Sequence, residues 1–382
     1  MYILKNADVY SPKSLGKTNL LVGGEQILAI NEKGYTNETS AETIDLSGKI
    51  VIPGGVDPHC HIIGGGGESG FSSRAPETQL SDYIKAGITT TVGLLGTDGM
   101  TRSVENVVSK AKALKEEGIT AYALSGYYGY PTLSITDSIE KDIVYIEEII
   151  GVKIAANDHR DSGVTPEELI KLGTQARRAG MISGKSGHVT VHMGEGKFNF
   201  DQINKALERS NIPITVFRPT HVNREKSLAM DAIDFAKKGG YIDITLDSSV
   251  AYEGTTNVEY IKAIKEAGVD LSRVILSTDG FGSWSDYDDQ GNLTRMGVIP
   301  IDTLLGMLKD LVEAGLSIEE AAALISTNAA DAYKFNRKGH IEEGYDADLV
   351  VLNEDLSLDG VMARGEWMMR DGELLKTGKF EK

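Results

Sequence analysis

Two patterns of apolar and polar positions divide the chain into a middle part and two ends. Residues 1–53 hold short apolar stretches separated by turn residues, without a helical period. From about residue 52 onward, short apolar runs alternate with stretches in which apolar residues recur every three or four positions. Residues 340–382 return to short strands. This division predicts a large central α/β unit between two β-rich ends.

Eight apolar runs in the middle part are predicted to be buried strands. The runs are 52–61, 89–96, 120–128, 152–158, 189–194, 214–222, 241–247 and 273–280. Strands that alternate with helices predict a parallel sheet. Eight units over roughly 280 residues match the (β/α)₈ TIM barrel, whose typical size is ~250 residues. An open doubly wound sheet is the alternative, and the even spacing of the units favours the barrel.

Two of the intervening stretches show the helical pattern well. Residues 138–150 carry isoleucines on one predicted helical face, at positions 139, 143, 146 and 150. Residues 166–179 follow Thr165, a suitable N-cap, and begin with Pro166 at the first helical position. Both stretches are therefore expected to be helices of the barrel's outer ring.

The β-rich ends are expected to pair with each other. Residues 1–53 and 340–382 would then form one small β-sandwich domain that is discontinuous in sequence, and residues 54–339 would form the barrel.

Composition narrows the possible partners and the location. The formal net charge is −17, from 56 acidic and 39 basic residues, so phosphate backbones and anionic membranes would repel the chain. We therefore expect no nucleic-acid partner and no membrane partner. Cys60 is the only cysteine, which excludes an internal disulfide and agrees with a reducing compartment. Residues 1–8 include an acid where a signal peptide would be apolar, so a cytoplasmic location is expected.

The first apolar run ends in a pair of histidines. His59 and His61 are two residues apart, so on a strand they point to the same side while Cys60 points away. Active sites of (β/α)₈ barrels lie at the carboxyl ends of the strands. Two imidazoles at a strand end favour half of a zinc site over a pair of hydrogen-bonded structural histidines. Cys60 is expected to pack in the wall.

The fourth run contains a lysine in an apolar strand. A charged Lys153 would be costly there unless it is paired or discharged. One solution is reaction with CO₂, which turns the amine into a carbamate whose two oxygens can bridge two cations. A salt-bridged lysine inside the barrel is the alternative, and both stay open at this point.

Three further strand ends carry candidate groups. His192 lies nearer the end of its run than His188, so His192 is the expected ligand and His188 the structural residue. His221 ends the sixth run. Asp279 ends the eighth, where it can serve as the base for a metal-bound water or, alternatively, as a turn or helix-cap residue. The groups on the other strands favour the catalytic role.

Two other histidines have weaker cases. His159 follows the fourth run and could line the mouth of the barrel, whereas His340 lies beyond the barrel and is expected at the surface.

The strand-end residues together resemble the amidohydrolase superfamily. The resemblance covers essentially the whole chain, including the split β domain, and its site residues are His59, His61, Lys153, His192, His221 and Asp279. It implies two zinc ions. The first-strand histidines and the aspartate bind one, the histidines of strands five and six bind the other, and a carboxylated lysine bridges the pair.

Within the superfamily the chain resembles the isoaspartyl (β-aspartyl) dipeptidases. The matching segments are 61–68, 92–98, 150–153, 158–160, 219–224 and 279–283. This likeness implies that Glu68 contacts the substrate α-ammonium and that Arg160 and Arg224 contact carboxylates. The loop after Asp247 departs from the family pattern.

The likeness assigns three more residues to the substrate. Tyr128 helps to polarise the scissile carbonyl, although Tyr127 and Tyr130 are close by, and Ser283 contacts the aspartyl end. Thr97 is expected in the substrate pocket as well. A homo-oligomer, such as an octamer, is also implied.

The implied reaction is hydrolysis of a β-aspartyl dipeptide. A hydroxide shared by the two zinc ions attacks the side-chain amide carbonyl, and Asp279 accepts its proton and passes it to the leaving amine. The ligand chemistry agrees, because one ammonium and two carboxylates require one acid and two fork-shaped donors, which Glu68, Arg160 and Arg224 supply. Surface ion pairs are the alternative for these three residues.

Two rival functions can be named. The first is another amidohydrolase, such as a dihydroorotase, a hydantoinase or an N-acyl-amino-acid deacylase; a cyclic-imide site needs no receptor for a free ammonium. The second is an inactive barrel that serves as a scaffold, which the complete ligand set disfavours.

Overall fold

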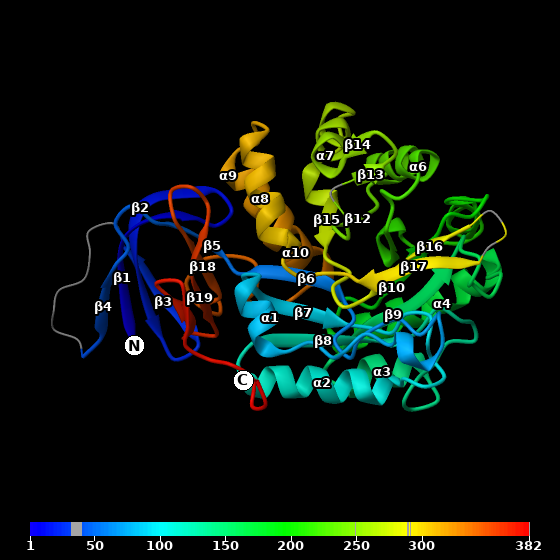
Figure 1. Cartoon of the computed structure of the whole chain (residues 1–382), viewed down its shortest axis with the longest axis horizontal. Coiled ribbons are helices and arrows are strands. Elements are labelled where there is room, and N and C mark those ends of the chain that lie inside the picture. The colour runs from blue at the N-terminus through cyan, green and yellow to red at the C-terminus, as the bar shows by residue number, and fades with distance from the viewer. Residues whose placement is uncertain (32–39, 249, 289, 291, 382) are drawn as a thin grey trace.

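A computed structural model describes residues 1–31, 40–248, 250–288, 290 and 292–381. Its larger part is a parallel eight-stranded barrel (Figure 1). The strands follow one another in chain order: β6 (Gly55–Cys60), β7 (Ile88–Gly93), β8 (Thr120–Gly126), β9 (Ile149–Ala156), β10 (His188–Met193), β11 (Phe217–Thr220), β12 (Ile242–Thr245) and β15 (Val274–Ser277). Each of the eight predicted runs overlaps one of these strands, so the barrel prediction is confirmed.

The first and last strands meet just beyond their ends. Cys60 forms a parallel bridge with Gly280. The amide of Asp279 donates to the carbonyl of His59 at 3.0 Å, and the amide of His61 donates to the carbonyl of Gly280 at 2.9 Å. These bonds place residues 59–61 and 279–280 side by side at the carboxyl end of the barrel.

Helices cover the outside of the barrel (Figure 1). They are α1 (Leu80–Lys85), α2 (Val104–Glu117), α3 (Ile139–Tyr145), α4 (Pro166–Ser183), α5 (Asp201–Glu208), α6 (Lys226–Lys237), α7 (Asn257–Glu266), α8 (Thr303–Glu313), α9 (Ile318–Ala322) and α10 (Asn328–Tyr333). Helix α4 begins as predicted, with the Thr165 side chain accepting from the amide of Glu168 in a capping box. Among the described residues, no helix is both long and apolar enough to cross a bilayer.

One helix prediction was wrong in its extent. Helix α3 starts after the N-cap Ser138 but ends at Tyr145, and β9 begins at Ile149. Ile150 is therefore a strand residue, not part of the helical face. An isoleucine-rich run satisfies both periodicities, and the sequence does not locate the turn between the two elements.

Strands from both chain ends form one nine-stranded sheet. The N-terminal strands are β1 (Tyr2–Tyr10), β2 (Ser14–Gly23), β3 (Gln26–Asn31), β4 (Glu42–Asp45) and β5 (Ile50–Pro53), and the C-terminal strands are β18 (Leu349–Leu352), β19 (Leu358–Ala363), β20 (Glu366–Arg370) and β21 (Glu373–Leu374). Strand β5 joins the two sets, because it pairs with β1 on one side and β18 on the other. The sheet has its own apolar core, which includes Leu4, Leu20, Leu349 and Met362. The predicted pairing of the two β-rich ends is thus confirmed.

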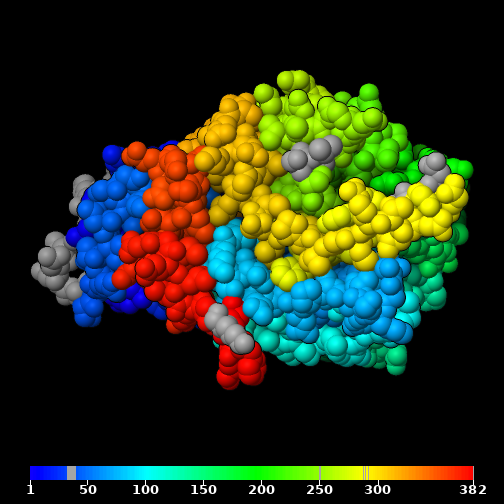
Figure 2. Space-filling model, in the orientation of Figure 1, coloured from blue at the N-terminus to red at the C-terminus, as the bar shows by residue number. Residues whose placement is uncertain are grey.

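Two antiparallel hairpins project from the carboxyl end of the barrel. One consists of β13 (Val250–Tyr252) and β14 (Thr255–Thr256), in the segment after Asp247 that departs from the expected pattern. The other consists of β16 (Ser283–Tyr287) and β17 (Leu293–Val298). Figure 2 shows the second hairpin, in yellow, lying on the surface above the cyan segments.

Candidate active site

Two histidines and one aspartate cluster where the first and last barrel strands meet. His59, His61 and Asp279 are buried, and one ligand atom from each lies within 4.8 Å of the others. Asp279 Oδ1 lies 3.1 Å from His61 Nε2 and 3.5 Å from His59 Nε2. Asp279 has a φ of 54°, in the left-handed region that residues other than glycine rarely adopt. Backbone strain of this kind persists where the surrounding structure over-determines it, and it gathers at functional sites.

The charge state of Asp279 follows from its neighbours. Burial alone would raise the pKa of this carboxyl, but the hydrogen bond from His61 and the charges of His59 and Arg224 outweigh that effect. The pKa is therefore held well below its usual value. Asp279 is an ionised carboxylate at neutral pH, as both a metal ligand and a base must be.

Lys153 lies inside the barrel beside this cluster. Its side chain is fully buried and its Nζ lies 2.9 Å from His59 Nε2. Among the described residues, no carboxylate lies within ion-pair distance of this amine. Burial lowers the pKa of Lys153 to about 7, and the charges of Asp279 and Asp243 only partly oppose that effect. The salt-bridged alternative left open by the sequence is therefore not what the structure has.

His192 and His221 lie on the other side of the same group. Their ring centroids are 4.6 Å apart, and the centroid of His221 is 4.8 Å from that of His59. His221 Nδ1 lies 2.6 Å from the hydroxyl of Thr245. Burial lowers the pKa of both imidazoles, that of His192 to about 3, so both rings are neutral at pH 7.

The donor set suits divalent cations. Neutral imidazole and ionised carboxylate are the nitrogen and oxygen ligands of zinc. Here four imidazoles, one carboxylate and one amine without a counter-ion gather in a buried space at the carboxyl end of the barrel. The structure brings together all six residues predicted as ligands.

Two buried aspartates behind the cluster were not predicted. The Asp57 carboxylate accepts from the hydroxyl of Thr278 at 2.6 Å and from the amides of Thr278 and His59. Asp243 Oδ2 accepts from Ser277 at 3.0 Å and lies 3.9 Å from His59 Nδ1. Burial raises the pKa of each carboxyl to about 7. Asp57 stands two residues before His59, which is the only signal that the sequence offers.

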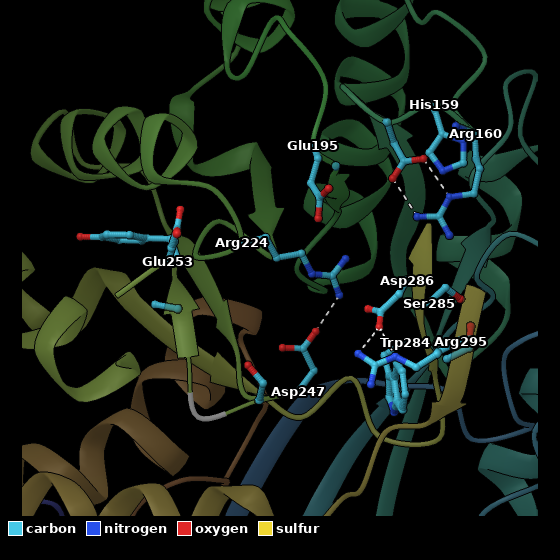
Figure 3. Close-up of a pocket in the computed structure, with 16 residues that line it drawn as sticks. His159, Arg160, Glu195, Arg224, Asp247, Glu253, Trp284, Ser285, Asp286 and Arg295 are labelled. Carbon is cyan, nitrogen blue, oxygen red and sulfur yellow. Dashed lines mark hydrogen bonds and ion pairs between the residues drawn. The ribbon is translucent and has the colours of Figure 1, made fainter. Parts of the chain in front are cut away.

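A cavity of about 600 Å³ is linked to the cluster through Arg224, which lines the cavity and contacts Asp279. Arg160, Arg224 and Ser283 line it, as do the two hairpins (Figure 3). Arg224 points into the space and donates to Asp247 at 2.9 Å and to Asp279 at 3.3 Å. Arg224 therefore connects the wall of the cavity to the candidate base.

Glu68 contacts two predicted residues that line this cavity. Its carboxylate accepts from the hydroxyl of Ser283 at 3.2 Å and lies 3.8 Å from Arg160. The three side chains come from different strand ends, so the fold brings together groups that are 92 to 215 positions apart. Thr97 lies near them and lines a smaller hollow that also includes Glu68.

A glycine loop that precedes Glu68 is held by a buried arginine. Gly64 has a φ of 74°, and a Cβ there would lie 2.2 Å from the carbonyl oxygen of Ala75, so only glycine fits. Arg102 donates to the carbonyls of Gly65 and Ala75 at 3.0 and 3.2 Å. Arg102 begins the segment leading into α2, and nothing in the sequence marks it as a partner of this loop.

Tyr128 is the tyrosine that reaches the site. Its hydroxyl lies 2.7 Å from His192 Nδ1, and the Arg160 guanidinium lies over its ring at 5.3 Å. Burial raises the pKa of its hydroxyl, so Tyr128 is a neutral hydrogen-bond donor.

The residues predicted not to be ligands lie elsewhere. His188 contacts Ser186 and Thr190 at the other end of its strand, and Cys60 packs against Tyr83. His159 lines the cavity mouth. His340 is half-buried rather than at the open surface, because it contacts Asp331 at 2.9 Å.

Comparisons with known proteins agree with this geometry. Residues 50–368 match the amidohydrolase family. Two crystal structures of the β-aspartyl dipeptidase of Fervidobacterium islandicum AW-1 are similar over all of both chains. One, in complex with β-Asp-Leu, is 38% identical with a TM-score of 0.92, and the other is 37% identical with a TM-score of 0.90. A 5-methylthioadenosine/S-adenosylhomocysteine deaminase of Halobacterium salinarum is 25% identical over 82% of this chain and 75% of its own length.

Proposed function

This chain belongs to the amidohydrolase family, and from that premise we propose that it is a zinc-dependent dipeptidase that hydrolyses β-aspartyl dipeptides. One observation carries the proposal. Arg160 and Arg224 line a cavity, Glu68 lies beside it at 3.8 Å from Arg160, and Arg224 reaches from the cavity to Asp279 of the buried His-His-Asp cluster. One acid and two arginines match the single ammonium and two carboxylates of a β-aspartyl dipeptide. The likeness to a β-aspartyl dipeptidase solved with β-Asp-Leu supports the same substrate.

Two zinc ions are part of the proposal. His59, His61 and Asp279 would hold one, and His192 and His221 would hold the other. Lys153, carboxylated by CO₂, would bridge them. A buried amine whose pKa is lowered to about 7 is about half unprotonated at neutral pH, and only the unprotonated amine reacts with CO₂. Bound zinc lowers the pKa of water and polarises a carbonyl.

The substrate would be oriented by charge. Glu68 binds the α-ammonium, Arg160 and Arg224 bind the carboxylates, and Ser283 contacts the aspartyl end. Thr97 also contributes to the substrate pocket. These contacts hold the side-chain amide carbonyl near Asp279 and Tyr128. Positioning of this kind lowers the activation barrier, because the reacting atoms are held close together before the reaction starts.

The proton would pass through Asp279. Its carboxylate accepts a proton from the attacking water and then donates it to the leaving amine, so the same residue serves as base and acid. The Tyr128 hydroxyl donates a hydrogen bond to the carbonyl oxygen as negative charge develops on it. Arg224 lies 3.3 Å from Asp279 and keeps its carboxylate ionised between turnovers.

The domain limits, the assembly and the location complete the proposal. We infer a small β domain of residues 1–53 and 340–382, a barrel of residues 54–339, a homo-oligomer and a cytoplasmic location. Sedimentation or light scattering would test the assembly.

The activity can be tested with three substrates and one variant. Zinc-loaded protein is expected to hydrolyse β-Asp-Leu and to leave α-Asp-Leu and dihydroorotate intact. Replacement of Glu68 by Gln should reduce kcat/KM for β-Asp-Leu by about 10–100-fold, because a charged hydrogen bond of ~1.5–3 kcal/mol is lost. Preferential hydrolysis of dihydroorotate, with no effect of Glu68→Gln, would establish the cyclic-amide alternative instead.

A further inference from the structure

Asp158 has no role in the proposal so far, yet it touches two of its residues. Its Oδ2 lies 2.9 Å from Nε2 of His192 and accepts from the Arg160 NH2 group at 2.8 Å. Its Oδ1 accepts from Nε of Arg160 at 2.9 Å and from the backbone amide of Arg160 at 2.8 Å. The side chain is 3% exposed. One buried carboxylate therefore contacts both a candidate metal ligand, through Oδ2, and a candidate substrate receptor, through both oxygens.

The surrounding backbone fixes where this carboxylate lies. The amide of Asp158 donates to Asp161 at 3.0 Å. On the opposite side Gly194, which follows β10, lies so close that a Cβ there would be 2.4 Å from Asp158 Oδ2. Asn157 donates to the carbonyl of Gly194 at 3.0 Å and so holds the two strand ends together. Position 194 therefore leaves no room for a larger side chain beside the Asp158 carboxylate.

The hydrogen-bond pattern determines which nitrogen of His192 carries the proton. An ionised carboxylate only accepts, so Nε2 must be the donor toward Asp158. A neutral imidazole then has a lone pair on Nδ1, which is the atom that lies 2.7 Å from the Tyr128 hydroxyl. A metal-binding histidine ordinarily donates its other ring N–H to a carboxylate or carbonyl in this way.

We propose that Asp158 is a positioning residue that presents Nδ1 of His192 to a divalent cation and, through the same carboxylate, holds the Arg160 guanidinium against the substrate cavity. The inference rests on the proposed function for the identity of the substrate. The presentation of His192 to zinc does not depend on what is hydrolysed.

A matched pair of variants tests this role. Asp247 also binds an arginine of the cavity, Arg224, but among the described residues it contacts no histidine. Asp158→Asn exchanges an acceptor for an amide that can turn toward His192 Nε2 and move the ring proton to Nδ1. Asp247→Asn removes the same charge from the same cavity and leaves His192 unaffected.

The first measurement is zinc binding to metal-free protein, by competition with a chromophoric chelator and without substrate. Asp158→Asn is expected to weaken one of the two zinc sites by about 10–100-fold, as loss of a carboxylate behind a metal-bound histidine does. Asp247→Asn should bind zinc as the unaltered protein does. Equal zinc affinity in Asp158→Asn and the unaltered protein, or an equal loss in both variants, would overturn the proposal.

The second measurement is the KM for β-Asp-Leu at saturating zinc. Saturating zinc should restore any loss of kcat in Asp158→Asn, whereas the KM of this variant should stay raised. If zinc binding changes as expected but neither the unaltered protein nor the variants hydrolyse β-Asp-Leu, the positioning of His192 stands and the dipeptidase proposal fails. If Asp158→Asn does not fold, Gly194→Ala displaces the carboxylate without removing its charge, and the same loss of zinc affinity is expected. Full zinc affinity in Gly194→Ala would contradict the proposal.

Discussion

Two buried lysines, one at the barrel mouth and one near the nine-stranded sheet, meet opposite surroundings. Lys338 is 4% exposed, and its Nζ lies 2.8 Å from Asp346 Oδ2 and 2.7 Å from Asp348 Oδ2. Lys153 is 0% exposed, and its nearest polar neighbour is an imidazole nitrogen. The pKa of Lys338 is raised, because the two carboxylates outweigh its burial, whereas burial lowers the pKa of Lys153 to about 7.

The difference distinguishes a structural charge from a chemical group. A buried charge with well-placed counter-ions is satisfied within the fold. A buried amine without a counter-ion, set among imidazoles in a cavity, is costly to the fold and is a signature of a functional site. The comparison predicts that changes at the mouth affect turnover more than stability, and that changes at Lys338 do the reverse.

The largest expected effect comes from replacing Asp279, at the carboxyl end of the barrel. Asp279→Asn should reduce kcat by about 10³–10⁴-fold, because the general base and acid is lost. The zinc content, measured by atomic emission, should remain close to that of the unaltered protein. Turnover within a factor of ten of the unaltered protein would show that another group moves the proton.

The next largest effect is expected at Lys338. Lys338→Met should lower the free energy of unfolding by about 3–5 kcal/mol, because it leaves two buried carboxylates without their shared cation. Denaturant unfolding measures this loss. Turnover per folded molecule should stay unchanged, and a selective fall in kcat would contradict the structural assignment.

The pH dependence of stability separates the two lysines further. Between the folded pKa of Lys153, about 7, and the unfolded value of ~10.4, the unfolded chain holds one more proton at this position, so rising pH favours the folded, metal-free protein. The slope is at most ~1.4 kcal/mol per pH unit. Lys153→Met should remove this slope.

The contribution of Lys338 to stability changes with pH in the opposite direction. Because its pKa is raised in the folded protein, Lys338 gives a stabilisation that is complete below ~10.4 and is lost as the pH rises above that value. Unfolding of the metal-free unaltered protein and of metal-free Lys153→Met at pH 7 and pH 9 checks the slope from Lys153, and an unchanged slope in Lys153→Met would count against the prediction. Lys338→Met should leave the slope in this range unchanged, because Lys338 loses its proton only above ~10.4.

The smallest predicted effect concerns the loop before Glu68. Arg102→Met should raise the KM for β-Asp-Leu by about tenfold and change kcat little, because the bonds of Arg102 to the carbonyls of Gly65 and Ala75 orient that loop. In the Glu68→Gln background the same substitution should have little further effect. Additive losses in the double variant would show that Arg102 acts independently of Glu68.

Much of this organisation could be predicted from the sequence, for physical reasons. Strands buried on both sides read as apolar runs, so all eight were located, and ligand residues at their ends followed from the rule that barrel active sites lie there. The boundary between α3 and β9 could not be found, because isoleucines serve either element. Asp158 and Arg102 also escaped prediction. Each acts on a residue from another part of the chain, and such contacts leave no local pattern.

Anomalous diffraction at the zinc edge, from crystals of protein loaded with zinc in bicarbonate, tests the central claim most directly. The account predicts two zinc peaks, one beside His59, His61 and Asp279 and one beside His192 and His221, with additional density on Nζ of Lys153 between them. An unmodified Lys153 amine with no zinc beside His192 and His221 would contradict it.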